Sequence, residues 1–388
     1  MRRSWIALGV SLLGFAAAIL LPMMSRHPPR SGQPDAAPAL AVAAKAPAAP
    51  VVSPGRAAHP PRKRPSPEGE ALFQARGDRE KIRALLAEGV DIDALNQVGW
   101  TALEGAVIDK DVERIRFLLD AGADPNARNA DGDTALGSVS CVDLRSAELL
   151  IERGAQVDIA DDVVHYTPLH HCADRGEVAV IELLIAHGAE VDAARKDGST
   201  PLHDAAEGGR REAVSALLRH GASPVLRDDR QRTPLFRALD RGVNNVIDLL
   251  AVPEAIDIPN DKGTTALMRA IYNDDELSAR WLVEHGADVR LASHSGETAL
   301  HVAAGYASVD LVRFLLDEGA EVNAADSFGG SALDRAEFKH HEDIAALLIE
   351  RGAHVDKYRC VERFGGGTRV HLRRGGCPAG QEATRLPG

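Results

Sequence analysis

Apolar and polar positions in the middle of the chain follow one pattern that recurs about every 33 residues. Each unit has a short apolar segment that begins at a threonine or serine, and a second segment that ends in a leucine pair or a similar pair, usually followed by a glycine. A threonine suits the start of a helix and a glycine suits its end, so each unit is predicted to be a pair of short helices. The eight frames begin at Thr101, Thr134, Thr167, Thr200, Thr233, Thr265, Thr298 and Ser331, at spacings of 33 residues except for one of 32. In the shorter unit Pro253 replaces the glycine and is predicted to end the second helix abruptly.

One unit reads DGSTPLHDAAEGG at residues 197–209, and close variants of its TPLH segment open the other frames. On these residues, the chain resembles the ankyrin-repeat family over residues 68–356. The resemblance implies an all-α solenoid of stacked helix pairs with β-turn fingers, about nine units including caps, the first of which starts at Glu68 without the signature. It also implies that His170, His203 and His301 tie neighbouring turns together by hydrogen bonds instead of acting as general bases.

The N-terminal region has a different composition. Residues 5–24 are almost entirely apolar and long enough to span a bilayer as a helix, so residues 1–26 are predicted to be a signal anchor or a cleaved signal peptide. Either alternative places the rest of the chain at or beyond a membrane, and the alanine- and arginine-rich composition points to a bacterial periplasm. Residues 27–67 are rich in proline and alanine and are predicted to be a semi-rigid linker.

The C-terminal segment, residues 357–388, loses the repeat. It is basic and rich in glycine, so it is predicted to be a disordered tail. Cys360 and Cys377 within it are candidates for a disulfide in an exported chain. Cys141 and Cys172 lie in adjacent units at different frame positions, which disfavours a bond between them, and Cys172 is interpreted as a small core residue.

Charge is distributed unevenly along the chain. The net charge of −12 divides into +8 for residues 1–67, −25 for residues 68–356 and +5 for residues 357–388. The acidic middle would repel a nucleic acid, so no nucleic-acid partner is expected. The chain has no Walker-type phosphate loop, HExxH motif, GxSxG elbow or paired CxxC motif, so no enzyme, cofactor or metal is predicted.

Two finger turns depart from the repeat and mark the predicted binding site. His165 and Gln231 stand where most fingers have a glycine, and Tyr166 follows the first of them. Basic residues near these turns are predicted to form a positive patch that docks an acidic partner, with a solvated charge run as the alternative. They are Arg195, Lys196, Arg227, Arg230, Arg232, Arg237 and Arg241.

Aromatic side chains are a second group of candidate contacts, because exposed rings often dominate the energy of an interface. They are Trp100 and Tyr166 in fingers, and Tyr272, Tyr306 and Phe338 at or next to positions expected on the concave face. The family resemblance implies a protein–protein interaction module or scaffold without catalysis. The alternative function is a small-ligand or metal-binding exported protein that uses His165, His171 and the nearby arginines.

Overall fold

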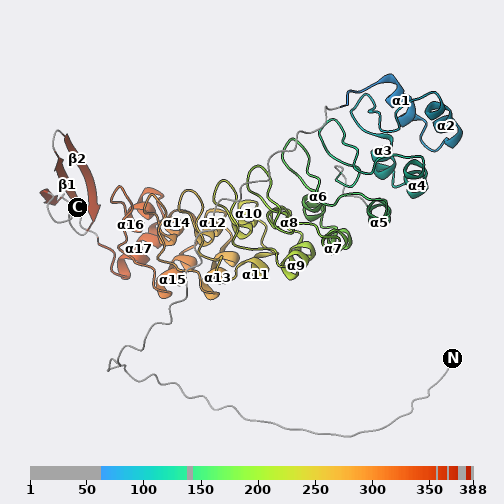
Figure 1. The fold of residues 1–388 in the computed structure, drawn as a ribbon. Coiled ribbons are helices and arrows are strands. Elements are labelled where there is room, and N and C mark those ends of the chain that lie inside the picture. The colour runs from blue at the N-terminus through green and yellow to red at the C-terminus, as the bar shows by residue number, and fades with distance from the viewer. Residues whose placement is uncertain (1–62, 138–142, 355–356, 365–366, 375–381, 386–388) are drawn as a thin grey trace, which may run out of the picture. The chain divides into compact units, whose positions relative to one another are not determined.

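The computed structural model describes residues 63–137, 143–354, 357–364, 367–374 and 382–385. Short helices fill the first two ranges, and each helix pair packs on the next one along the chain (Figure 1). This arrangement confirms the predicted solenoid of helix pairs. In the described ranges no helix is long and apolar enough to cross a membrane, and the predicted span at residues 5–24 lies outside them.

The helices form two rows, one for each member of a pair (Figure 1). The first-helix row consists of α1 (Pro67–Gln74), α3 (Ala102–Ile108), α6 (Pro168–Arg175), α8 (Pro201–Glu207), α10 (Pro234–Asp240), α12 (Ala266–Tyr272), α14 (Ala299–Tyr306) and α16 (Ala332–Phe338). The second-helix row consists of α2 (Arg79–Ala87), α4 (Val112–Asp120), α5 (Leu144–Glu152), α7 (Val178–Ala186), α9 (Arg211–Arg219), α11 (Ile247–Leu250), α13 (Glu276–Glu284), α15 (Val309–Asp317) and α17 (Glu342–Glu350). A finger turn connects the second helix of one unit to the first helix of the next.

The repeated histidines join capping residues to the next finger. The Thr167 side chain caps α6, and Nδ1 of His170 in turn accepts the backbone N–H of Thr167 at 3.2 Å. The same reciprocal pair starts α8 and α14. Because Nδ1 accepts, Nε2 carries the proton and donates to a carbonyl of the following finger, as in the 3.0 Å bond from His203 to Arg232. The structural role predicted for His170, His203 and His301 is confirmed.

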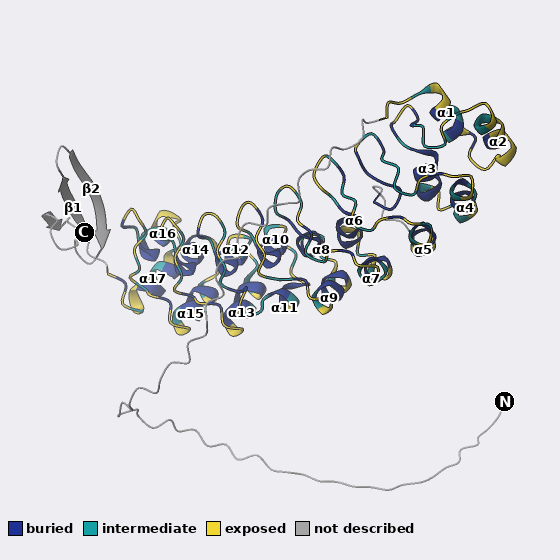
Figure 2. Cartoon of the chain, viewed as in Figure 1, coloured by how far each residue is buried: buried dark blue, intermediate teal, exposed yellow. Residues whose placement is uncertain are grey.

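Small aliphatic side chains build the core between the two rows (Figure 2). Leu118, Leu184, Leu217 and Leu315 of the second-helix row are fully buried, as are the alanines in the middle of α8. Small side chains allow successive layers to approach closely. Trp281 is half-buried and packs against this core.

Two units depart from the regular pair. Helix α11 has four residues and ends at Leu250, before Pro253, as predicted for a proline near that position. The unit that starts at Thr134 has a turn at residues 135–137 and no first helix among its described residues. Both departures lie inside the repeat array.

Cys172 in α6 is fully buried and is bonded in a disulfide whose second cysteine lies outside the residues with described side chains. It is therefore a core residue, as predicted, and also part of a covalent cross-link. Cys377 and the side chain of Cys360 are outside the described part of the chain, where the predicted disulfide between them also falls.

Three strands follow the helices: β1 (Lys357–Phe364), β2 (Gly367–Arg374) and β3 (Glu382–Arg385). They form an antiparallel sheet in the order β2-β1-β3. This differs from the disordered tail predicted from composition. The physical reason lies in alternating patterns such as Val370 and Leu372 between polar residues, which suit a strand and outweigh the glycine-rich composition.

Candidate functional site

Backbone hydrogen bonds join neighbouring fingers into one continuous row. The Lys196 N–H donates to the Val164 carbonyl at 3.1 Å, and the Asp229 N–H donates to the Asp197 carbonyl at 2.8 Å. Equivalent bonds connect the fingers before and after them. The fingers therefore present a preorganised surface, which lowers the ordering cost of binding.

The two fingers without a glycine have the same left-handed backbone conformation at this position as the other fingers. His165 has a φ of 61° and Gln231 a φ of 57°, close to the 76° of Gly198 in the finger between them. A side chain in this region is disfavoured by contact between Cβ and the backbone. These turns therefore keep the common finger shape and carry local strain.

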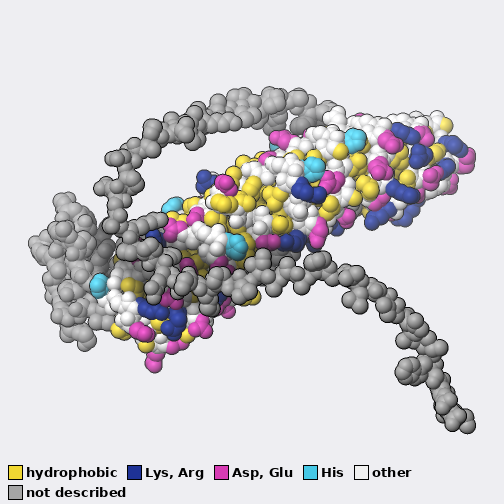
Figure 3. Space-filling model, turned by 90° about the horizontal axis from the view of Figure 1, so that it is seen from below, with side chains coloured by type: hydrophobic (Ala, Val, Ile, Leu, Met, Phe, Trp, Pro, Cys, Tyr) yellow, Lys and Arg dark blue, Asp and Glu magenta, His cyan; other side chains and the backbone are white. Residues whose placement is uncertain are grey.

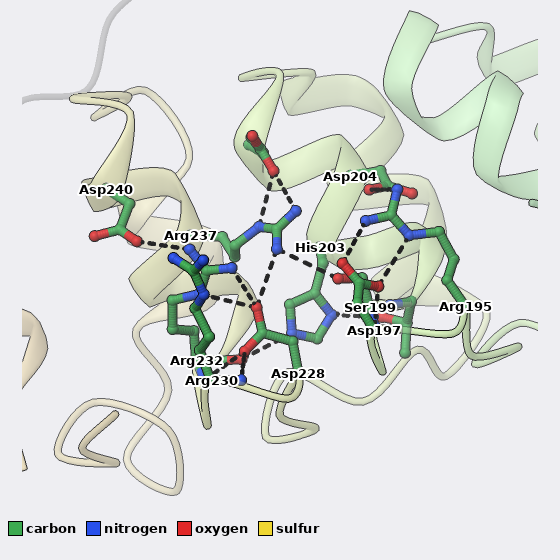
Figure 4. Close-up of polar contacts among 12 residues, drawn as sticks. Arg195, Asp197, Ser199, His203, Asp204, Asp228, Arg230, Arg232, Arg237 and Asp240 are labelled. Carbon is green, nitrogen blue, oxygen red and sulfur yellow. Dashed lines mark hydrogen bonds and ion pairs between the residues drawn. The ribbon is translucent and has the colours of Figure 1, made fainter. Parts of the chain in front are cut away.

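A charged pocket of about 560 Å³ is lined by residues of the fingers and of α8, α10 and α12. Figure 4 shows the polar contacts among several of its lining residues. Its walls combine residues from three consecutive units. Five arginines line it: Arg230, Arg232, Arg237, Arg241 and Arg269. Five acids face them: Asp197, Glu207, Asp228, Asp229 and Asp240.

Ion pairs join the deeper members of the charged pocket. Arg237 lies 3.0 Å from Asp228 and donates through Nε to Glu207 at 2.8 Å. Arg232 connects Asp228 at 2.7 Å with Asp240 at 2.9 Å. Although burial raises the pKa of Asp228, its bonds to both arginines lower it below the usual range. The deep arginines therefore stabilise buried carboxylates of this chain.

The predicted positive patch is thus corrected to a charge-balanced pocket. Arg232 and Arg237 are committed to ion pairs, and Arg241 pairs with Glu207. Asp228 and Asp240 neutralise Arg232 within its own unit. Glu207 of the preceding unit comes to lie beside Arg237 and Arg241 when the units stack. On the face drawn in Figure 3, basic side chains likewise lie among acidic ones.

Arg195 forms a second charged contact beside the pocket (Figure 4). Its guanidinium lies 3.3 Å from Oδ1 of Asp204 and 3.0 Å from Asp197, and it stacks over the Tyr166 ring at 5.0 Å. The other oxygen of Asp204 is buried and has no hydrogen-bond partner among the described residues. Burial raises the pKa of the Asp204 carboxyl to about 7, although Arg195 and Arg237 lower it.

Tyr166 packs inward against two histidines. Its ring centroid lies 4.4 Å from that of His171 and 5.3 Å from that of His170. Burial raises the pKa of the Tyr166 hydroxyl above its usual range. Tyr166 is therefore half-buried, and only part of its ring faces solvent in the finger.

His171 faces an acidic residue of the preceding unit. Its Nε2 lies 3.9 Å from Asp133, and burial lowers the pKa of His171 to about 4 while raising that of Asp133 to about 8, so both are neutral near pH 7. Across the described ranges no three histidine, cysteine or acidic side chains are grouped to hold a metal ion. His165 is exposed in its finger, whereas His171 is half-buried in α6. The structure gives no support to the small-ligand or metal alternative.

The exposed part of these fingers is a different set of residues, which we call the finger surface. Val163 is 56% exposed and Val164 is 45% exposed. The Lys196 ammonium stabilises their loop by donating to the Asp162 carbonyl at 2.7 Å and to the Val163 carbonyl at 2.6 Å. The finger surface comprises Val163, Val164, His165, Tyr166, Lys196, Arg227 and Arg230. Arg227 and Arg230 are exposed, and within the described ranges neither forms an ion pair. The sequence analysis did not single out the two valines. The segment DDVVHYT could have indicated them, because it places two apolar residues in a finger turn.

The remaining aromatic candidates lie in separate places. Trp100 is half-buried and lies 6.4 Å from Phe73, so it packs on its neighbouring unit. Tyr272 and Tyr306 lie 5.5 Å apart in the first-helix row and are 36% and 44% exposed. Phe338 of α16 is 77% exposed. The structure thus brings Tyr272 and Tyr306 together and separates them from Trp100.

Comparison with known proteins gives one family and a few partial relatives. A family model for ankyrin repeats matches residues 70–161, 138–228, 224–293 and 289–359. A 2-5A-dependent ribonuclease of Mus musculus is 34% identical over 58 residues, which are 15% of this chain and 8% of that protein. Ankyrin repeat and SOCS box protein 6 of Homo sapiens, like that of Pongo abelii, is 28% identical over 160 residues, 40% of this chain and 31% of that protein. The matched segments span less than a third of each of these relatives.

Proposed function

Because the chain belongs to the ankyrin-repeat family, we propose that it is a protein-binding module without catalysis, whose finger surface docks a partner with apolar and acidic side chains. The observation that carries this proposal is a row of hydrogen-bonded fingers in which two exposed valines lie next to Lys196, and the finger after that of Lys196 carries the exposed Arg227 and Arg230. An apolar contact with a cationic border is complementary to an apolar segment that carries carboxylates.

The surrounding structure supports this choice of surface. The fingers are fixed by backbone bonds, so a partner would meet them with little loss of loop freedom. Arg232 and Arg237 are satisfied by buried acids and are therefore part of the support beneath the surface, whereas Arg227 and Arg230 keep their guanidinium donors for a partner. The match to a ribonuclease covers 8% of that protein and carries no activity over to this chain.

We also propose that the chain is exported, held at a membrane by residues 5–24 or released after signal cleavage, with the repeats in the periplasm. The apolar N-terminal run supports export. The disulfide at the buried Cys172 is consistent with an oxidising compartment, because such bonds are rare where thiols are kept reduced. Fractionation of cells that express the full chain tests this proposal, and N-terminal sequencing of the mature protein decides between anchor and cleaved signal. Recovery in the cytoplasm alone would refute export.

The docking proposal is tested in two steps. A photoreactive amino acid at His165 in the full chain should capture one protein, whereas the same amino acid at Leu277, which is 80% exposed on α13, should not. The captured protein is then purified and titrated with the chain. Replacing Arg227 and Arg230 by glutamate should weaken that binding by about tenfold, less so at high salt.

A matched control separates local from general charge effects. Arg313→Glu changes an exposed arginine of α15 and should leave the affinity unchanged. Equal losses for the control and for the double finger variant would point to long-range electrostatics. Equal capture at His165 and Leu277 would reject the finger surface as the docking site.

A further inference from the structure

One finger is a residue longer than the others, although its turn at His165 keeps the common backbone conformation. In the seven other fingers that the structure describes, a closing bond runs from an N–H to the carbonyl four residues later, as from Asp228 to Arg232 at 3.0 Å. In the finger of residues 161–166 the closing bond runs from Asp161 to Tyr166, five residues later, at 3.0 Å. The 33-residue spacing conceals the extra residue, because α5 begins one residue earlier in its frame than α7 does.

The extra residue is Val163. Inner fingers donate one N–H to the finger before them and accept one bond from the finger after them. In the next finger these two groups belong to consecutive residues, since Lys196 donates and Asp197 accepts. In the longer finger Asp162 donates and Val164 accepts, so Val163 stands between the two attached residues. The loop therefore projects between its attachments, and both valines are exposed on it. We call Val163 and Val164 the valine tip.

Polar contacts hold the valine tip in one conformation. The buried Asp161 carboxylate accepts the N–H of Val163 at 2.6 Å and that of Val164 at 2.7 Å. The Lys196 ammonium binds the Asp162 and Val163 carbonyls from the next finger. A loop fixed in this way presents its apolar side chains with little further loss of freedom on binding.

One charge lies at the edge of the valine tip. An ammonium has three N–H groups, and Lys196 uses two of them on carbonyls of the loop, so one is left for a partner. Lys196 is exposed and forms no ion pair within the described ranges. Asp197 next to it is already paired with Arg195 at 3.0 Å. The uncompensated charge on this side of the valine tip is therefore that of Lys196.

The shape of the valine tip indicates the kind of partner. Two apolar side chains on a projecting loop leave water on several sides only when they enter a concave surface, whereas an extended segment covers them on one side. Residues that dominate an interface are typically those that fill a desolvated pocket of the other protein. A carboxylate at the rim of such a pocket would accept the remaining N–H of Lys196.

We propose that the valine tip inserts into an apolar pocket of a folded partner protein, and that a carboxylate at the rim of this pocket binds Lys196. This inference deepens the proposed function and rests on it. It assigns the dominant contact of the finger surface to Val163 and Val164, and it selects a folded protein with a pocket over an extended segment.

The probe is the protein captured at His165, purified and titrated with the full chain by calorimetry. Deletion of Val163 gives the finger the length of the others and should lower the affinity at least about tenfold, because apolar residues that fill a pocket dominate binding. Val163→Ser/Val164→Ser keeps the length of the finger and should cause a similar loss. Lys196→Met should lower the affinity about threefold, and less at high salt, because a single exposed charge pair contributes little.

Two matched controls alter the same residue types in fingers of regular length. Val98→Ser removes a valine that is 69% exposed, and Lys262→Met removes an exposed lysine two fingers beyond Lys196. Both variants should bind like the unmodified chain. Unchanged thermal unfolding of every variant ensures that binding is compared between folded proteins.

A second experiment distinguishes a pocket from an extended segment. The cross-link at His165 identifies the attached segment of the captured protein, and a synthetic peptide of that segment should bind at least about tenfold more weakly than the folded protein. Equal binding of the peptide, or full affinity of the deletion and double serine variants, overturns the inference while the proposed function stands. If His165 captures no protein, the proposed function fails and the inference fails with it.

Discussion

The guanidinium of Arg237 lies 3.0 Å from the carboxylate of Asp228, and both side chains are buried beneath the fingers. The two residues belong to one unit, with Asp228 in the finger and Arg237 in α10. Arg237 also reaches Glu207 of the preceding unit. One buried cation therefore fixes a finger to two first helices, so the charged pocket and the finger surface above it depend on this contact.

Replacing Arg237 by methionine should destabilise the fold by about 3 kcal/mol, because the change leaves the buried Asp228 with one fewer partner. The expected loss lies at the low end of the usual range, since Arg232 still pairs with Asp228 at 2.7 Å. The midpoint of unfolding in guanidinium chloride or urea measures it.

Arg230→Met is the control for this change. Arg230 lines the same pocket, is exposed and forms no ion pair within the described ranges. Its replacement should shift the free energy of unfolding by less than about 0.5 kcal/mol. Equal effects of the two substitutions would show that the deep ion pairs do not stabilise the array.

The repeat pattern was sufficient to predict the helix pairs, because each signal acts locally. A threonine such as Thr167 caps its own helix, and His170 three residues later completes the cap. The repeat frame also showed that His165 stands where most fingers have a glycine, and the structure gives this residue a positive φ. These features need no knowledge of neighbouring units beyond the existence of a repeat.

Contacts between units could not be predicted in this way. The neutralisation of Arg237 by Glu207 depends on stacking across 30 residues of sequence. The meeting of Tyr272 and Tyr306 likewise depends on how neighbouring units stack, because the two rings come from different frame positions and still lie 5.5 Å apart. The strands of the C-terminal segment were not predicted, because that prediction used composition and ignored the alternation of apolar and polar residues.

His203 should make stability depend on pH. Burial lowers its pKa to about 4, so the folded state favours the neutral ring and the unfolded chain binds the proton more readily. The contribution of His203 is constant above its unfolded pKa of about 6.5, and it is lost as the pH falls from there towards 4. At pH 5 the loss should be about 2 kcal/mol relative to pH 7.

The measurement is the free energy of unfolding at pH 7 and pH 5 for the unmodified chain and for His203→Gln. Other groups titrate equally in both proteins, so the difference between the two pH dependences isolates His203. The variant is expected to be less stable at pH 7 and to lose less stability on acidification. Parallel pH profiles would contradict a neutral buried histidine.

Asp204 should have the opposite dependence. Burial raises its pKa to about 7, so the folded state favours the protonated carboxyl, and its contribution is present at low pH and lost as the pH rises from about 4 to 7. Asp204→Asn keeps the shape and cannot ionise. The stability of this variant relative to the unmodified chain should therefore increase between pH 4 and pH 8 in thermal or denaturant unfolding. A relative stability that decreases over this range would show that the pair with Arg195 outweighs the cost of burial.

The finger backbone offers a pair of reciprocal substitutions. Gln231 has a φ of 57°, where a side chain costs about 1 to 2 kcal/mol and glycine costs nothing in steric terms. Part of that gain is offset by the greater freedom of glycine in the unfolded chain, so Gln231→Gly should stabilise the array by about 0.5 kcal/mol.

Gly198→Gln makes the opposite change one finger earlier, where φ is 76° and a new Cβ would lie 3.2 Å from Cα of Asp228. It should destabilise by more than Gln231→Gly stabilises, because backbone strain is then combined with a contact against a buried residue. Unfolding midpoints of the two variants test this order, and a loss of stability in Gln231→Gly would mean that the glutamine side chain makes a compensating contact in the finger.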